Sequence, residues 1–69
     1  MTVVVLNGER RELPGRATLE TAVRAIGATD GRGVAVALDG EVVPRGEWAS
    51  TEVRDGQQVE VLHAVQGGS

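Results

Sequence analysis

The sequence predicts one α+β domain, in which a mixed sheet of four or five strands packs one face against one helix. Twelve valines dominate the apolar residues, and valine favours strands over helices. Short apolar runs alternate with two-residue turn signals, and a single segment has the spacing of an amphipathic helix. A chain of 69 residues suffices for one such two-layer domain.

The first predicted hairpin opens the chain. The apolar run Thr2–Leu6 ends at Asn7-Gly8, a dipeptide that strongly favours a two-residue hairpin turn. The return strand Glu9–Leu13 is polar enough for a sheet edge, and Pro14-Gly15 closes it.

The helix is predicted directly after this hairpin. Thr18 has the side chain of an N-cap, and an apolar stripe follows it at helical spacing. The stripe consists of Leu19, Ala22, Val23 and Ile26. Glu20 and Arg24 can pair one turn apart, and Gly27 is the expected residue just beyond the C-terminus.

A loop and a second hairpin are predicted next. The glycine-rich segment 28–33 lacks the lysine and the strand–turn–helix context of a phosphate-binding loop, so we expect no phosphate there. Val34–Leu38 is a second apolar run, Asp39-Gly40 a second hairpin turn, and Glu41–Val43 the strand that returns to Pro44.

The segment between this hairpin and the last strand, Arg45–Ser50, is expected to be irregular. Trp48 is the only aromatic residue, and we expect it to pack over one end of the core and not to bind a ligand. Asp55-Gly56 gives a third turn.

The last strand is predicted around Val59 and Val61, which alternate with Glu60 as in a half-buried strand. Four or more strands around one crossed helix in so short a chain fit the β-grasp architecture. In that architecture the first and last strands pair in parallel at the centre of the sheet.

The segment after Val65 contains two adjacent glycines, which have no side chains. Residues 1–65 are predicted to form the domain and residues 66–69 a flexible tail that contains Gln66, Gly67 and Gly68. Glycine lets another backbone approach closely, so such a tail can thread a tunnel that a side chain would block. A frayed end without function is the alternative, and the glycine pair alone leaves both interpretations open.

Composition excludes several classes of function. No cysteine is present, which excludes disulfides and thiolate metal sites and makes the cytoplasm the expected compartment. A net charge of −3 without a basic cluster argues against a nucleic-acid partner, and no apolar run approaches the ~20 residues of a membrane span. His63 is the only histidine, and no nucleophile–base pair is visible, so we expect neither a metal site nor an enzyme.

Several short motifs occur together in the second half of the chain: Pro44-Arg45, Trp48, Asp55-Gly56, Val59-Glu60-Val61 and Val65-Gln66-Gly67-Gly68. Together they resemble the ThiS family, the sulfur carrier proteins of thiamin thiazole biosynthesis. The resemblance covers nearly the whole chain. The terminal glycine pair alone is shared with ubiquitin and its relatives, whereas its combination with Pro-Arg-x-x-Trp is more specific.

The resemblance implies a role for the terminal glycine. In this family a ThiF-type activating enzyme uses ATP and Mg²⁺ to adenylate the terminal glycine carboxylate, which here is that of Gly68. Sulfide derived from cysteine then displaces AMP to give a thiocarboxylate, and a ThiG-type thiazole synthase takes the sulfur. The chain itself is expected to bind no cofactor. Because the family pattern ends at Gly68, either a protease removes Ser69 or the native chain ends one residue earlier.

Two questions stay open at the level of sequence. Leu62, Ala64 and Val65 form either an apolar docking patch beside the tail or ordinary sheet packing. The alternatives to the thiazole sulfur carrier are a related carrier for molybdopterin or cysteine synthesis and a non-covalent β-grasp binding module with an inert tail.

Overall fold

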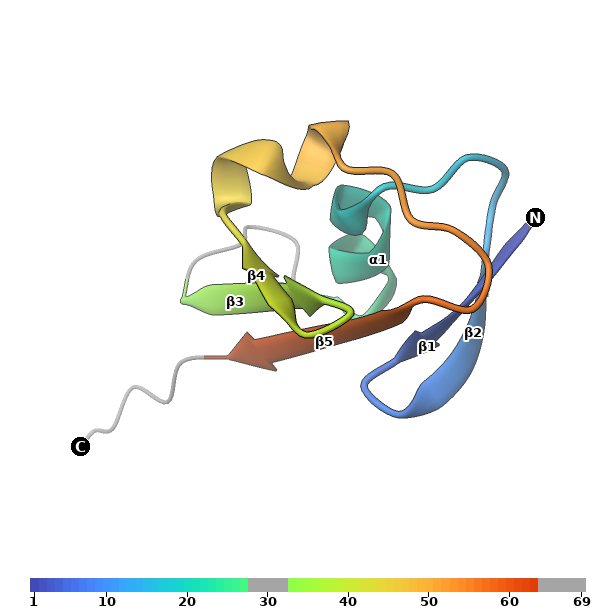
Figure 1. Cartoon of the computed structure of the whole chain (residues 1–69), viewed down its shortest axis with the longest axis horizontal. Helices are drawn as coiled ribbons and strands as arrows, with labels where there is room; N and C mark the ends of the chain where they lie inside the picture. Colours follow the sequence, from blue (N-terminus) through green and yellow to red (C-terminus); the bar gives the residue numbers. More distant parts are fainter. Residues whose placement is uncertain (28–32, 64–69) are drawn as a thin grey trace.

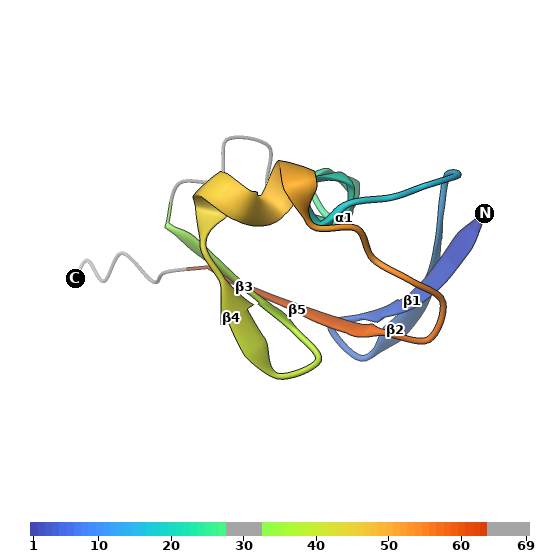
Figure 2. The ribbon, with the colours of Figure 1, turned by 45° about the horizontal axis from the view of Figure 1, so that its top comes forward.

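The fold is a helical layer on one face of a sheet (Figures 1 and 2). The computed structural model describes residues 1–27 and 33–63. In chain order the elements are β1 (Thr2–Leu6), β2 (Glu9–Leu13), α1 (Leu19–Ala25), β3 (Val34–Leu38), β4 (Glu41–Val43), the 3-10 helix η1 (Arg45–Ser50) and β5 (Gln58–His63). Figure 2 shows α1 and η1 on the same face of the sheet. The predicted α+β class and β-grasp architecture are confirmed.

The sheet has the order β2-β1-β5-β3-β4, so the last strand of the chain is its central strand. β5 pairs in parallel with β1, where Leu6 lies opposite Val59. On its other side β5 pairs antiparallel with β3, from Leu38 opposite Val59 to Val34 opposite His63. The predicted parallel pairing of the first and last strands is therefore correct.

Two tight turns close the hairpins as predicted. Asn7 and Gly8 have φ angles of 51° and 83°, and Asp39 and Gly40 have φ angles of 48° and 88°. Positive φ at both central residues is the type I′ geometry, whose twist matches that of the flanking strands. Asparagine and aspartate tolerate this conformation better than other residues with a side chain, and glycine tolerates it best.

The helix α1 begins and ends at the predicted residues. The Thr18 hydroxyl accepts a hydrogen bond from the Thr21 amide at 3.3 Å, and the Thr21 hydroxyl accepts one from the Thr18 amide at 3.3 Å. This is a capping box in which threonine takes the usual place of glutamate. At the other end Gly27, with φ 87°, donates to the Arg24 carbonyl at 3.0 Å.

The core is aliphatic apart from one ring. Its buried residues are Val4, Leu6, Leu13, Ala17, Leu19, Ala22, Val23, Val36, Trp48, Val53, Val59 and Val61. Trp48 packs against this cluster with 4% of its surface exposed, and its indole N–H donates to the Val43 carbonyl at 2.9 Å. The predicted packing role of Trp48 is confirmed.

The prediction for Arg45–Ser50 was wrong, because this segment forms the 3-10 helix η1. The Glu47 amide donates to the Pro44 carbonyl at 2.8 Å, and the Thr51 amide donates to the Trp48 carbonyl at 3.3 Å. Both bonds span three residues, as in a 3-10 turn. Six residues are too few for helical periodicity to be visible in the sequence.

Charging the buried face of α1 is expected to unfold the domain. Val23 is 2% exposed, so Val23→Asp leaves a charge without a partner under the sheet and costs about 3–5 kcal/mol. Glu20→Ala is the control, because the Glu20–Arg24 pair is exposed and 3.8 Å long, and its loss costs a few tenths of a kcal/mol. Thermal melts followed by circular dichroism measure both. A cooperative melt for Val23→Asp would contradict the assigned helix face.

Candidate functional site

The predicted site is the chain end, and the structure describes its base. Gly68, Gly67, Gln66, Ala64 and Val65 lie outside the described residues, so their predicted roles and the domain boundary after residue 65 stay predictions. The described part of the chain ends in β5, whose last residue is His63.

The base of the tail belongs to the core of the domain. Val59 and Val61 are 0% and 3% exposed on the face of β5 that carries the helical layer. Glu60 and Leu62 alternate with them and are exposed. Because β5 also has a neighbouring strand on each side, the direction in which the chain leaves the sheet is fixed by buried contacts and by hydrogen bonds.

Asn7 binds β5 where β1 no longer reaches it. Its amide N–H donates to the Val59 carbonyl at 2.9 Å. Its side chain then makes two bonds with Val61: Oδ1 accepts from the Val61 amide at 2.7 Å, and Nδ2 donates to the Val61 carbonyl at 3.2 Å. One side-chain amide thus provides the donor and the acceptor that the next residue of a strand would have provided.

Asp39 also binds the backbone of β5 with both its own backbone and its side chain, near the start of the strand. Its amide donates to the Gln58 carbonyl at 2.8 Å, its Oδ1 accepts from the Gln58 amide at 2.9 Å, and its Oδ2 accepts from the Gln57 side chain at 3.0 Å. In the third turn, Asp55 Oδ1 accepts from the Val3 amide at 2.7 Å. Sequence reasoning missed these bonds, because the two-residue turns already explain asparagine and aspartate at these positions.

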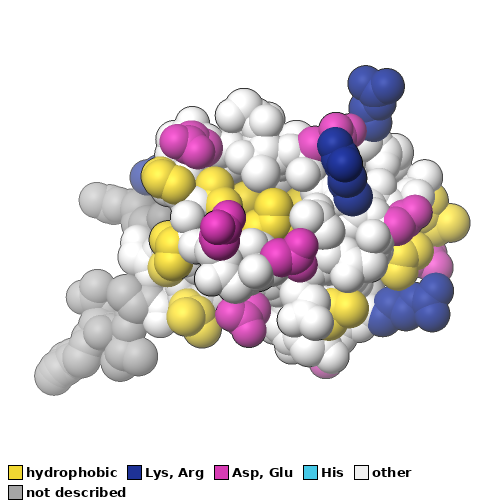
Figure 3. Space-filling model, viewed as in Figure 1, with side chains coloured by type: hydrophobic (Ala, Val, Ile, Leu, Met, Phe, Trp, Pro, Cys, Tyr) yellow, Lys and Arg dark blue, Asp and Glu magenta, His cyan; other side chains and the backbone are white. Residues whose placement is uncertain are grey.

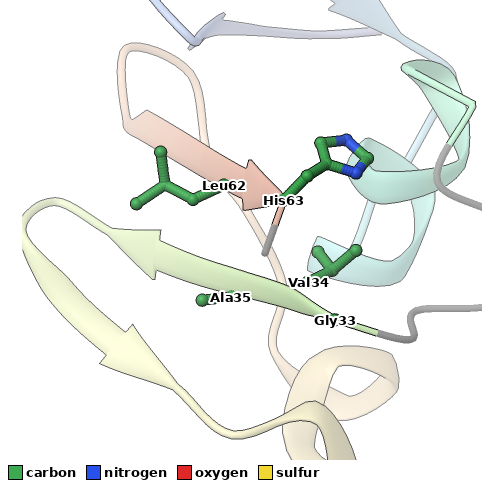
Figure 4. Close-up of a pocket in the computed structure, with 5 residues that line it drawn as sticks. All are labelled: Gly33, Val34, Ala35, Leu62 and His63. Carbon is green, nitrogen blue, oxygen red and sulfur yellow. The ribbon is translucent and has the colours of Figure 1, made fainter. Parts of the chain in front are cut away.

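The two faces of the sheet differ at the end of β5. Leu62 and Ala35 project to one side of the strand pair, and His63 and Val34 project to the other (Figure 4). These four residues and Gly33 line an open hollow of about 290 Å³. A small-molecule site is larger and more enclosed, so this hollow is better described as part of the surface.

The face of the sheet opposite α1 carries an apolar patch. Leu62 is 67% exposed and Val42 is 75% exposed. Ala35 lies opposite Leu62 in the register, and Ala37 lies opposite Val42. We call these four residues the open-face patch. Leu62 is thus exposed and available to a partner, as one of the two sequence-based interpretations requires.

The described residues show no centre for chemistry of their own. They contain no group of three or more His, Asp or Glu side chains that could hold a metal ion. Within the same residues, no buried side-chain nitrogen or oxygen lacks a hydrogen-bond partner. His63 is exposed. No helix in the described part of the chain is long and apolar enough to cross a membrane.

A β-grasp domain whose central strand leads to a terminal glycine pair has the arrangement of the ubiquitin-like carrier proteins. The family model of the ThiS family matches residues 4–68, and the chain belongs to this family of sulfur carriers. The match ends at Gly68, one residue before Ser69.

Two solved structures of a thiamine biosynthesis protein (ThiS) from Geobacter metallireducens are similar to this chain. The crystal structure is 29% identical, with 97% of this chain and 100% of that chain covered and a TM-score of 0.77. The NMR solution structure is 28% identical, with 99% and 90% covered and a TM-score of 0.77. The β-grasp fold is therefore shared with a solved relative.

A longer curated protein is also similar. A thiazole synthase from Paramagnetospirillum magneticum is 36% identical over 66 residues, which are 96% of this chain and 20% of that protein. The chain thus spans about a fifth of the length of this relative.

Matched substitutions on the two faces of β5 are expected to differ in cost. Leu62→Thr should change the free energy of unfolding by less than ~0.5 kcal/mol, because Leu62 is 67% exposed and threonine suits a strand. Val61→Thr keeps the shape but buries a hydroxyl at a position 3% exposed, and should cost about 1–3 kcal/mol. Urea unfolding followed by Trp48 fluorescence measures both, and equal costs would contradict the assigned faces.

Proposed function

We propose that this protein carries sulfur on the carboxyl group of Gly68 and delivers it to a thiazole synthase in thiamin biosynthesis. The observation that carries the proposal is the position of β5. This central strand is paired on both sides and ends at His63, five residues before Gly68 in a chain that matches the ThiS family through residue 68.

The proposed chemistry converts a poor acyl group into a reactive one. A carboxylate oxygen of Gly68 attacks the α-phosphorus of ATP, the bond to the β-phosphate breaks, and pyrophosphate leaves. Sulfide derived from cysteine then attacks the acyl carbon, the bond to the AMP oxygen breaks, and a thiocarboxylate remains. Adenylation supplies the leaving group that a free carboxylate lacks.

In this proposal the chain is a substrate and not the catalyst. Adenylation needs a nucleotide cradle and Mg²⁺, which a ThiF-type activating enzyme supplies. The carrier contributes a terminal carboxylate on residues slim enough to enter that enzyme. We place the reaction in the cytoplasm, in agreement with a sequence that has no cysteine.

The proposed acceptor of the sulfur is a ThiG-type thiazole synthase. Support comes from the long relative, which is named a thiazole synthase and has a segment similar to nearly all of this chain. A carrier-like segment joined to a synthase in one chain is expected if the carrier and the synthase act on one another.

The proposed docking surface is the open-face patch with Ala64 and Val65. It is apolar, and Leu62 places it two residues upstream of Ala64 on the strand that leads to Gly68. Figure 3 shows acidic side chains over β4 and η1, but η1 lies on the helical face of the sheet. On the face of Leu62 the exposed acidic residue of β5 is Glu60, which lies opposite Ala37 in the register. A partner with an apolar groove and a basic side chain opposite Glu60 fits this surface.

Removing the tail tests the proposal against a non-covalent binding module. A chain without Gly67, Gly68 and Ser69 should melt within about 1 °C of the full chain, because terminal residues contribute little to stability. It should form no thiocarboxylate with ATP, sulfide and the activating enzyme, as measured by intact mass. The full chain is the control. Thiazole synthesis with the truncated chain as the sole carrier would contradict the proposal.

The length of the tail provides a second test. A chain that ends at Gly68 should be adenylated at least about 10²-fold faster than one that ends at Ser69. The added residue moves the Gly68 carbonyl back by up to ~3.5 Å, and misplacement by ~1 Å is enough for such a loss. Pyrophosphate release with the two chains measures the ratio. If the ratio is this large, a processing protease is needed wherever Ser69 is present. Equal rates of pyrophosphate release from the two chains would contradict the assignment of Gly68 as the activated residue.

A further inference from the structure

The two neighbours of β5 differ in length. β3 accompanies β5 as far as His63, whereas the pairing with β1 ends where Leu6 lies opposite Val59. Beyond Leu6 the chain turns away at Asn7-Gly8 into β2. Among the described residues on this side of β5, the Asn7 side chain is the group that hydrogen-bonds to Val61, through the bonds of 2.7 and 3.2 Å.

Without Asn7 the end of β5 would be held by one strand. Residues that alternate along a strand bond to opposite sides, so the peptides of Glu60 and Leu62 face β3 and that of Val61 faces Asn7. β4 reaches β3 only as far as Val36, which lies opposite Val61, so beyond Val61 the described strand β5 pairs with β3 alone. A ribbon of two strands is marginally stable by itself in water. The two bonds to Asn7 therefore hold Val61, on the side of β5 away from β3, at the point where the weakly supported end of the strand begins.

Asp39 offers a matched comparison within the same protein. It occupies the same position of the same type of turn, with φ 48° against 51° for Asn7. It also bonds the backbone of β5 with its side chain, but at Gln58, at the end of the strand farther from the tail. Losing either side chain removes bonds to the same strand, and only the loss of Asn7 loosens the end that leads to Gly68.

We propose that Asn7 is a positioning residue for Gly68. Its side-chain amide fixes the backbone at Val61 and therefore fixes the point from which the tail leaves the sheet. This inference rests on the proposed carrier function and adds a residue to it. If β5 frays from Val61, more residues separate Gly68 from the last residue that the sheet holds in place. The effective concentration of the Gly68 carboxylate in the activating enzyme then falls at least as the −3/2 power of the length of this connecting chain. The direction in which the connecting chain leaves the sheet is also no longer fixed.

The test uses Asn7→Gly with Asp39→Gly as its matched control. Glycine keeps the positive φ at both positions and gives Gly-Gly, which a type I′ turn accepts. Each variant loses only side-chain bonds. Asn7→Asp is a milder variant, because its carboxylate still accepts from the Val61 amide while the donor to the Val61 carbonyl is lost.

Amide hydrogen exchange reports the local effect. In Asn7→Gly the Val61 amide should exchange roughly tenfold faster, and the Leu62 amide, which Asn7 does not touch, should also become faster. In Asp39→Gly the Gln58 amide should accelerate while Val61 and Leu62 stay within about twofold. Unchanged Leu62 exchange in Asn7→Gly would overturn the inference, because fraying would then not spread toward the tail.

Pyrophosphate release by the activating enzyme reports the functional effect, at a temperature where all variants are folded. The kcat/KM of Asn7→Gly should fall by roughly threefold or more, that of Asp39→Gly should stay near wild type, and that of Asn7→Asp should lie between. Equal rates for Asn7→Gly and Asp39→Gly would overturn the positioning role alone. A wild-type chain that releases no pyrophosphate would overturn the proposed function instead.

Discussion

The hydrogen-bonding requirement of β5 organises the whole domain. A central strand is buried on one face, so its peptide groups need partners on both sides. β3 provides them along one side, and β1 and Asn7 together provide them along the other. The turn between β3 and β4 contributes through Asp39. Each hairpin thus holds β5 with one strand and with the first residue of its turn. The apolar stripe of α1 then covers one face of the resulting sheet.

Local signals predicted most of the fold because they were strong and agreed with one another. Asn7-Gly8 and Asp39-Gly40 specify the turn type almost alone, and Thr18 with the apolar stripe specifies the helix. Once two hairpins and one helix are defined, the apolar stripe of α1 can be buried in few ways other than against one face of a sheet that the hairpins form. The signal at η1 was too short, since this 3-10 helix has six residues.

The candidate site was predictable in a different sense. The glycine pair is read directly from the sequence, and the alternation along β5 places Leu62 on the face opposite Val59 and Val61. Whether that face packs within the sheet or docks a partner was left open by the sequence. The contacts of Asn7 and Asp39 with β5 join residues far apart in the chain, and both side chains already have a local explanation in their turns. A residue with two roles shows only the local one in a sequence. This is why the support of the tail became visible only in three dimensions.

The parallel pairing of β1 and β5 also separates two chain positions. Strands that run in the same direction place the start of β1 and the end of β5 at opposite ends of the sheet (Figure 1). Met1, just before β1, is 76% exposed, and the sequence contains no lysine, so no side chain presents a primary amine. An amine-reactive dye or surface linker therefore finds no side chain in the domain, and an amine supplied at the Met1 end would attach it remote from His63.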